Sequence, residues 1–333
     1  MNDTLKSLNN CCPALKLEQL GSWIDQVNNN LVGLFVTKWY VDKTNGSDTN
    51  AGDALSPFAT IQAAINAASA RDVIIIKAAT VAAGGTDPVD YAENLIIPAA
   101  KFGLALIGDN KGRTQGGLPE IKKGSGSSPL LTVRAPGCLI ANLGFNGAGS
   151  TGGGILLDDD GSTKVAFGTT IVNNHFKNCK GTTATDARTG GAIMWSAQGN
   201  AWQVLIQGNR FYKNVGDIVL LGTGGSVPQD VIIEDNIFSG PAASVDCNLY
   251  LAGGSGMNGV IIRNNSFTAF PAIGAGSVVR FADLTGCIGT LEGNNFADTG
   301  TSTGYGAAKA KAKVPTTVLM SRNYSEGGLI TRE

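Results

Sequence analysis

The 333-residue sequence predicts an all-β fold, a solenoid of stacked parallel rungs, on three observations. A short motif recurs along most of the chain. Glycine is abundant, at 46 residues, whereas charged residues make up only 15%, a composition that favours strands joined by many tight turns. No helix-forming stretch of about 10–15 residues separates the copies of the motif, which argues against alternating strands and helices.

The recurring motif is a β-branched run, a polar pair ending in asparagine, one variable residue and a phenylalanine. Two copies are residues 231–238 (VIIEDNIF) and residues 260–267 (VIIRNNSF), and successive phenylalanines lie 27 to 35 residues apart. A period of this length predicts a solenoid in which each rung pairs with the rungs above and below. A β-propeller or a sandwich with coincidentally similar turns is the alternative.

Equivalent positions of a solenoid stack on one another, so identical side chains are expected to form ladders. The predicted asparagine ladder consists of Asn174, Asn209, Asn236, Asn265 and Asn294. The predicted phenylalanine stack consists of Phe176, Phe211, Phe238, Phe267 and Phe296, preceded by Phe145. Stacked amides in a buried turn would satisfy backbone hydrogen-bonding groups.

The repeat, together with the segment before it, resembles the right-handed parallel β-helix, or pectate-lyase-like, superfamily over roughly residues 39–323. The segment carries YVD at 40–42, NGSD at 45–48, SPFATIQAAINAA at 56–68 and DVIII at 72–76. It is similar to the first rungs of β-helices in phage spikes, bacterial surface proteins and polysaccharide-active enzymes, and most like phage spike and virion proteins. The resemblance implies the fold and is much less specific for function.

A helix near residues 57–70 is predicted to cap the open end of the solenoid. Ser56 is a good N-cap, Pro57 suits the first helical position, and Phe58, Ile61 and Ile65 fall on one face. A cap is needed because a terminal rung otherwise exposes strand edges and apolar core. A calcium loop from Asp42 onward is the alternative for the preceding segment, although its acids lack EF-hand spacing.

Residues 1–36 lie outside the repeat and are predicted to form an N-terminal extension, with the β-helix occupying residues 37–333. The extension contains an amphipathic helix whose apolar residues are Leu17, Leu20, Trp23, Ile24 and Val27. We expect this helix either to pack on the side of the solenoid or to anchor the protein to a partner chain.

Residues that could carry chemistry are few. Asp158 and Asp160 are the catalytic candidates, as an acid/base pair or a cation site, and Trp195 and Trp202 could stack on sugar rings. The single histidine, His175, is expected to be structural rather than a base. The sequence predicts no metal and no cofactor.

Composition excludes some partners and leaves three classes of function. The net charge of −1 argues against nucleic acid, and no apolar run is long enough for membrane insertion. Because the N-terminus resembles no secretion signal and no catalytic set is complete, we expect a phage virion protein rather than an enzyme: a spike, fibre or capsid decoration, made in the host cytoplasm. It would be a homo-oligomer, a trimer by analogy, attached to other virion subunits through residues 1–36 and presenting loops to a host glycan. The alternatives are a polysaccharide lyase or glycoside hydrolase, and a bacterial surface adhesin.

Overall fold

The computed structural model describes the chain in segments. These are residues 36–79, 91–109, 117–122, 126–148, 151–161, 165–183, 186–197, 201–222, 227–239, 247–269, 280–298, 313–325 and 328–329. Internal contacts divide the chain into two units, Met1–Thr37 and Lys38–Glu333. The architecture below is that of the second unit. Among the described residues, no helix has the length and apolar character needed to cross a bilayer.

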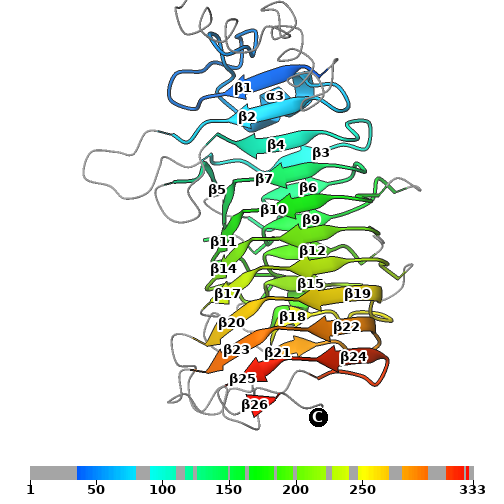
Figure 1. The fold of residues 1–333 in the computed structure, drawn as a ribbon. Coiled ribbons are helices and arrows are strands. Elements are labelled where there is room, and N and C mark those ends of the chain that lie inside the picture. Colours follow the sequence, from blue (N-terminus) through cyan, green and yellow to red (C-terminus); the bar gives the residue numbers. More distant parts are fainter. Residues whose placement is uncertain are drawn as a thin grey trace, which may run out of the picture. The chain divides into compact units, whose positions relative to one another are not determined.

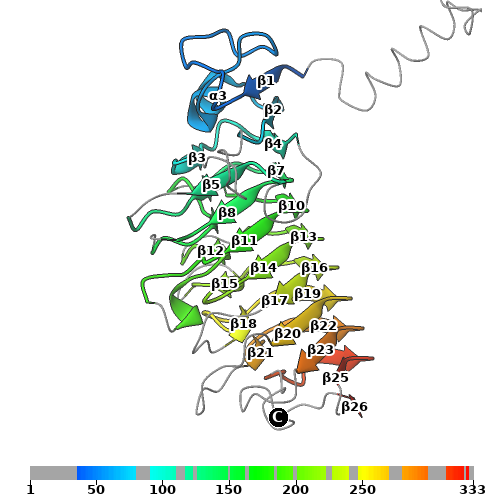
Figure 2. The same ribbon diagram turned by 90° about the vertical axis from the view of Figure 1, so that its left-hand side faces the viewer.

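The strands of the second unit form three parallel sheets that wind around one core, which confirms the predicted parallel solenoid (Figures 1 and 2). The ten-stranded sheet contains β1 (Lys38–Val41), β2 (Val73–Ile76), β4 (Ala105–Gly108), β7 (Leu139–Ala141), β10 (Thr170–Val172), β13 (Leu205–Gln207), β16 (Ile232–Glu234), β19 (Asn258–Arg263), β22 (Ile288–Glu292) and β24 (Val318–Ser321). The seven-stranded sheet contains β3 (Leu95–Ile97), β6 (Leu131–Val133), β9 (Ile155–Leu157), β12 (Ile193–Trp195), β15 (Ile218–Leu220), β18 (Cys247–Tyr250) and β21 (Arg280–Asp283). The nine-stranded sheet contains β5 (Glu120–Lys122), β8 (Gly144–Asn146), β11 (His175–Lys177), β14 (Arg210–Tyr212), β17 (Ile237–Ser239), β20 (Ser266–Ala269), β23 (Asn295–Asp298), β25 (Tyr324–Ser325) and β26 (Gly328–Leu329), the last of which is antiparallel.

Each copy of the motif forms a strand of the ten-stranded sheet, a tight turn and a strand of the nine-stranded sheet. Copies one rung apart pair in exact sequence register, as Phe238 does with Phe211 and Phe267. The conformation of the turn explains which residue types occupy the first position of the polar pair. Asn173, Asp235 and Asn264 adopt a positive φ of 56°, and glycine occupies the same place in other copies. Asparagine, aspartate and glycine tolerate this left-handed conformation best.

The second residue of the pair is buried and forms a continuous amide ladder. The Asn236 Nδ2 donates to the Oδ1 of Asn265 at 3.0 Å and to the backbone carbonyl of Ile206 at 3.0 Å. Its own Oδ1 accepts from the backbone and the side chain of Asn209. The same pattern runs from Asn174 to Asn323, one rung beyond the predicted members. The ladder therefore satisfies backbone groups that the turns leave buried.

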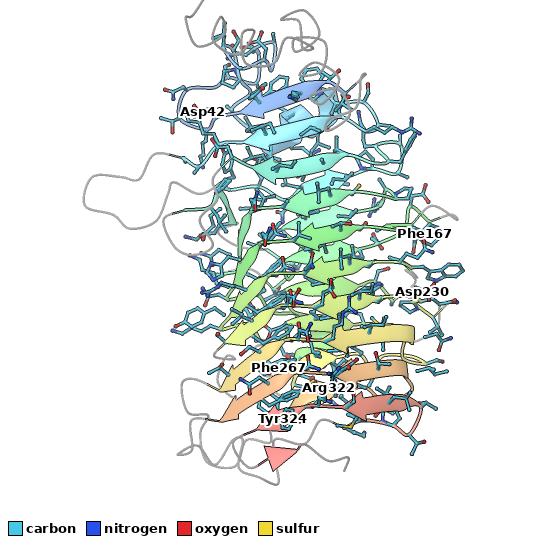
Figure 3. All side chains as sticks on the ribbon, viewed as in Figure 1. Asp42, Phe167, Asp230, Phe267, Arg322 and Tyr324 are labelled. Atoms are coloured by element: carbon cyan, nitrogen blue, oxygen red, sulfur yellow. The ribbon has the colours of Figure 1, made fainter. Side chains whose placement is uncertain are left out.

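The phenylalanines stack beside this ladder inside the solenoid. Ring centroids of neighbours from Phe145 to Phe296 lie 4.5 to 5.1 Å apart, with interplanar angles of 8° to 12°. Phe267, labelled in Figure 3, is one of the fully buried members. Because each ring faces inward, the residues immediately before and after it face outward.

The helix predicted near residues 57–70 is shorter, because α3 spans Ile61–Ala67 and its N-cap is Thr60 rather than Ser56. Phe58 cannot be helical since it pairs with Val41 beside β1. The buried face of α3 contacts β1, β2 and β3. The Gln62 side chain also exchanges hydrogen bonds with the backbone of Ile96 in β3. Closure of the solenoid by α3 stays a prediction.

Candidate functional site

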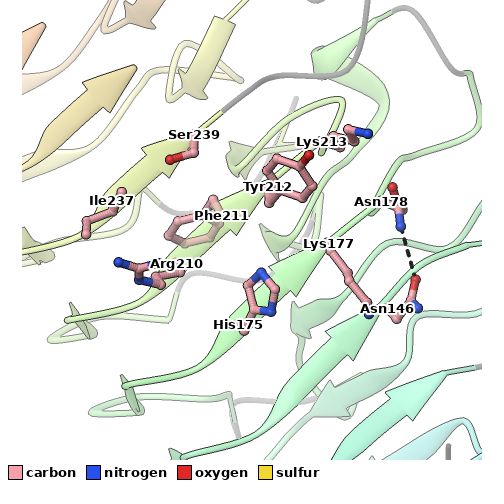
Figure 4. Close-up of a pocket in the computed structure, with 10 residues that line it drawn as sticks. All are labelled: Asn146, His175, Lys177, Asn178, Arg210, Phe211, Tyr212, Lys213, Ile237 and Ser239. Carbon is pink, nitrogen blue, oxygen red and sulfur yellow. Dashed lines mark hydrogen bonds between the residues drawn. The ribbon is translucent and has the colours of Figure 1, made fainter. Parts of the chain in front are cut away.

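A pocket of about 660 Å³ lies on the outer face of the nine-stranded sheet, a size common for ligand sites. Its lining comes from β8, β11, β14 and β17 and from the turns that follow β11 and β14 (Figures 2 and 4). The lining residues are Asn146, His175, Lys177, Asn178, Arg210, Phe211, Tyr212, Lys213, Ile237 and Ser239. Most of them flank the stacked phenylalanines, so the alternation of the strands presents them to solvent.

Positive charge dominates the pocket. Lys177 is compensated by Glu120 of β5, with 2.7 Å between Nζ and Oε2 and only 9% of either side chain exposed. Asn146 donates to the other Glu120 oxygen at 2.8 Å. Arg210 and Lys213, in contrast, have no carboxylate partner among the described residues. The site therefore holds two uncompensated cations in a chain whose net charge is −1.

Tyr212 gives the pocket an exposed aromatic surface. It is 38% exposed, and the Nζ of Lys213 lies 5.2 Å from its ring centroid. In the register of the sheet, His175 lies beside Arg210, and Lys177 lies beside Tyr212. The Tyr212 ring can stack on the apolar face of a ligand ring, while the neighbouring cationic side chains pair with anionic substituents of that ligand.

The two turns at the edge of the pocket share a buried hydrogen-bond network. Asn214, which follows Lys213, accepts from the backbone N–H of Cys179 at 2.8 Å, and its Nδ2 donates to Asp217 at 2.9 Å. Asn248 donates to the second Asp217 oxygen at 2.7 Å. Burial raises the pKa of the Asp217 carboxyl to about 7, because desolvation disfavours its ionised form more than the two amides stabilise it.

The acidic candidates from the sequence, Asp158 and Asp160, are not among the residues that line the pocket, and their catalytic role stays a prediction. The Asp158 carboxylate is held by Arg134, with Nε 3.1 Å from Oδ2, and Asp159 accepts from the Gly161 N–H within its own turn. β9 ends at Leu157, so strand alternation does not continue through to Asp160. In the described segments, no cluster of histidine, cysteine and acidic residues is suited to a metal.

Of the two tryptophans predicted to stack on sugar rings, Trp195 lies in the core and cannot do so, whereas stacking on Trp202 stays a prediction. Trp195 is fully buried, and its Nε1 donates to the carbonyl of Ala201 at 3.0 Å, so it presents no ring face to a ligand. Trp202 is 37% exposed and packs against Phe167 at 5.6 Å between centroids. The anchor residues Leu17, Leu20, Trp23, Ile24 and Val27 lie outside the described residues.

Most of the pocket escaped the sequence analysis because no local motif marks it. His175 lines the pocket beside Arg210, and its predicted structural role stays a prediction. The usable signal was the pair of residues flanking each inward phenylalanine. These flanking positions are basic or aromatic in two successive copies, HFK at 175–177 and RFY at 210–212, and in the following copy they are isoleucine and serine.

Comparisons with known proteins support the fold. No protein-family model matches the chain, and no curated protein sequence matches it. Among solved structures, the GH136 lacto-N-biosidase of Eubacterium ramulus superposes with a TM-score of 0.59 at 12% identity, covering 92% of this chain. This chain spans 58% of that enzyme. A pectin methylesterase variant in complex with a hexasaccharide aligns over 89% of this chain and 92% of its own, at 13% identity and a TM-score of 0.39. The three parallel sheets and the superposition on the lacto-N-biosidase together give the chain the right-handed parallel β-helix fold.

Proposed function

We propose that this protein binds an anionic glycan in the pocket on the outer face of the nine-stranded sheet. The observation that carries the proposal is the placement beside the exposed ring of Tyr212 of two cations, Arg210 and Lys213, that no carboxylate of the described segments compensates. Carboxylate or sulfate groups would pair with the cations, while the apolar face of a sugar ring would stack on the tyrosine.

The structural neighbours favour the carbohydrate-active alternative over the virion prediction. Both are enzymes whose names refer to glycans, a lacto-N-biosidase and a pectin methylesterase. The first superposes over nearly the whole of this chain, although at an identity that supports the fold alone. A virion role has no support from these comparisons.

The proposal is tested by binding measurements with two anionic polysaccharides, polygalacturonate and alginate, and with neutral dextran. We expect the anionic polymers to bind and dextran not to bind. Arg210→Ala combined with Lys213→Ala should weaken the affinity about 100-fold, as expected for the loss of two charge-assisted contacts.

Lys38→Ala is the matched control, because Lys38 is an exposed cation of β1 in a different sheet. It should leave binding unchanged. Equal binding by the double variant, or equal binding of dextran, would contradict the proposal.

A second candidate function is elimination of an anionic glycan rather than its hydrolysis. The described residues that line the pocket include no aspartate or glutamate, and the nearby Glu120 is engaged by Lys177 and Asn146. The described lining supplies no pair of carboxylic acids for hydrolysis. In an elimination, one of His175 and Tyr212 would take the proton from the sugar carbon beside the neutralised carboxylate. The C=C bond would form as the bond to the glycosidic oxygen breaks, and the other residue would protonate that leaving oxygen. Lyase activity would appear as an unsaturated uronide absorbing in the ultraviolet. It should be lost in His175→Gln or Tyr212→Phe with the fold intact.

A further inference from the structure

Asp217 is a buried acid that is not among the residues lining the pocket. It is hydrogen-bonded to Asn214, the residue next to Lys213 of the pocket lining. It is 3% exposed and accepts one amide proton from Asn214 and one from Asn248. Asn214 directly follows Lys213, and Cys179 directly follows Asn178. The Asn214 side chain joins the turns at Asn178 and Lys213 through the Cys179 N–H.

Both turns adopt a conformation that needs support. Asn178 has a φ of 56° and Lys213 a φ of 54°. The left-handed region is uncommon for lysine and carries strain that the surrounding structure must offset. Asn214 directly follows Lys213, and its amide oxygen accepts from the N–H of Cys179, which follows the Asn178 turn.

We propose that Asp217 is a positioning residue whose ionised carboxylate orients Asn214 and thereby sets the Asn178 and Lys213 turns for ligand binding. This inference rests on the proposed function of the pocket. An ionised carboxylate only accepts hydrogen bonds, so it holds the Asn214 NH₂ group toward itself and the amide oxygen toward the Cys179 N–H.

A protonated carboxyl instead carries a donor. Asn214 donates to Oδ1 and Asn248 to Oδ2, and the amide that faces the new O–H pairs with it best when its own oxygen turns toward Asp217. When Asn214 turns, the Cys179 N–H and the Phe176 carbonyl lose their partners. Because the pKa of Asp217 is raised to about 7, this change falls within the physiological range.

Other groups that titrate or carry charge surround this network. On the elements packed against Asp217 they are Lys213, Cys179, Asp186, Arg188, Cys247 and Tyr250. Asp186 and Arg188 pair with each other at 2.8 Å. His175 lines the pocket itself. A simple charge effect has the opposite sign to the positioning effect, because protonating Asp217 or His175 makes the site more positive and would tighten the binding of an anion.

The test measures polygalacturonate affinity at about pH 8 and about pH 6 at constant ionic strength. We expect the wild type to bind about tenfold more weakly at the lower pH, the size of one lost hydrogen bond. Asp217→Asn should bind weakly at both values, whereas His175→Gln should lose affinity on acidification at least as much as the wild type does. Tighter binding at low pH, or an unchanged profile in Asp217→Asn, would overturn the inference.

A second measurement needs no ligand and separates failure of this inference from failure of the proposed function. The backbone amide resonances of Cys179 and Lys213 should shift with a midpoint near the Asp217 pKa of about 7 in the wild type and not in Asp217→Asn. If those resonances respond while no anionic glycan binds, the network stands and the proposed ligand is wrong. If they do not respond, the positioning role is wrong whatever the protein binds.

Discussion

At the scale of single residues, two neighbouring asparagines can have opposite importance. Asn294 is 1% exposed and joins the ladder through Asn265, Asn323 and the Ile262 carbonyl. Asn295 is exposed on the outer face of β23. The difference follows from the pleat, which sends adjacent side chains to opposite faces.

Asn294→Ala should therefore lower the free energy of unfolding by about 3 kcal/mol or more. The buried N–H of Asn265 and the buried carbonyl of Ile262 would both lose the hydrogen bonds they make with the Asn294 side chain. Asn295→Ala is the matched control and should change the free energy of unfolding by less than about 0.5 kcal/mol. Urea unfolding of both variants measures the difference. Equal effects would mean that the ladder contributes no net stability.

The raised pKa of Asp217 also predicts that the free energy of unfolding depends on pH. Its folded pKa of about 7 lies above the ordinary value of 3.8, so the folded state retains a proton that the unfolded state releases. This contribution is complete below about pH 4 and declines as the pH rises toward 7, by up to about 4 kcal/mol. Asp217→Asn should remove this decline and be more stable than the wild type at about pH 8.

Parallel stability–pH curves for the two proteins would contradict the prediction. A variant that is more stable but binds less tightly would distinguish a positioning role from general support of the fold.

At the scale of elements, the strands are only three to six residues long in the three sheets, apart from the two-residue β25 and β26, and none is stable alone. Pairing in register lets each short strand contribute one inward residue to a continuous column. The Phe238 ring, for example, lies 4.7 Å from that of Phe211 and 4.5 Å from that of Phe267. Stability is thus distributed over the interfaces between rungs.

Phe238→Ala should cost about 3–5 kcal/mol of unfolding free energy, because it leaves a cavity between two stacked rings. Phe238→Leu fills most of that space and should cost about 1–2 kcal/mol. Chemical denaturation with an unchanged m-value would confirm that both act on the folded state. A cost for alanine no larger than that for leucine would show that the rungs close the gap.

At the scale of the whole molecule, internal contacts place the whole solenoid in one structural unit of the chain. They divide the chain at Thr37 and Lys38, and every described member of the main core comes from Val41 onward. The predicted attachment through residues 1–36, the homo-oligomer and the virion location all stay predictions, as does the domain boundary after residue 36.

Deleting residues 1–36 should leave a cooperatively folding β-helix whose free energy of unfolding changes by less than about 1 kcal/mol. The reason is that internal contacts separate the chain into the units Met1–Thr37 and Lys38–Glu333. Circular dichroism during urea unfolding measures this outcome, and glycan binding should persist because the pocket lies within residues 146–239. Loss of cooperative unfolding would place part of the core in the deleted segment.

The sequence by itself determined the repeat and the fold, since each copy of the motif contains the residues that form its own turn, ladder position and core position. A left-handed residue makes the turn, as Asp235 does, an asparagine joins the ladder and a phenylalanine enters the core. Only the tertiary structure decided the site. His175 and Arg210 are 35 residues apart in sequence and become neighbours through strand pairing, and their environment depends on turns such as that of Lys213. The start of α3 and the burial of Asp217 were likewise decided by packing, because pairing of Phe58 with Val41 and enclosure of the acid both depend on distant segments.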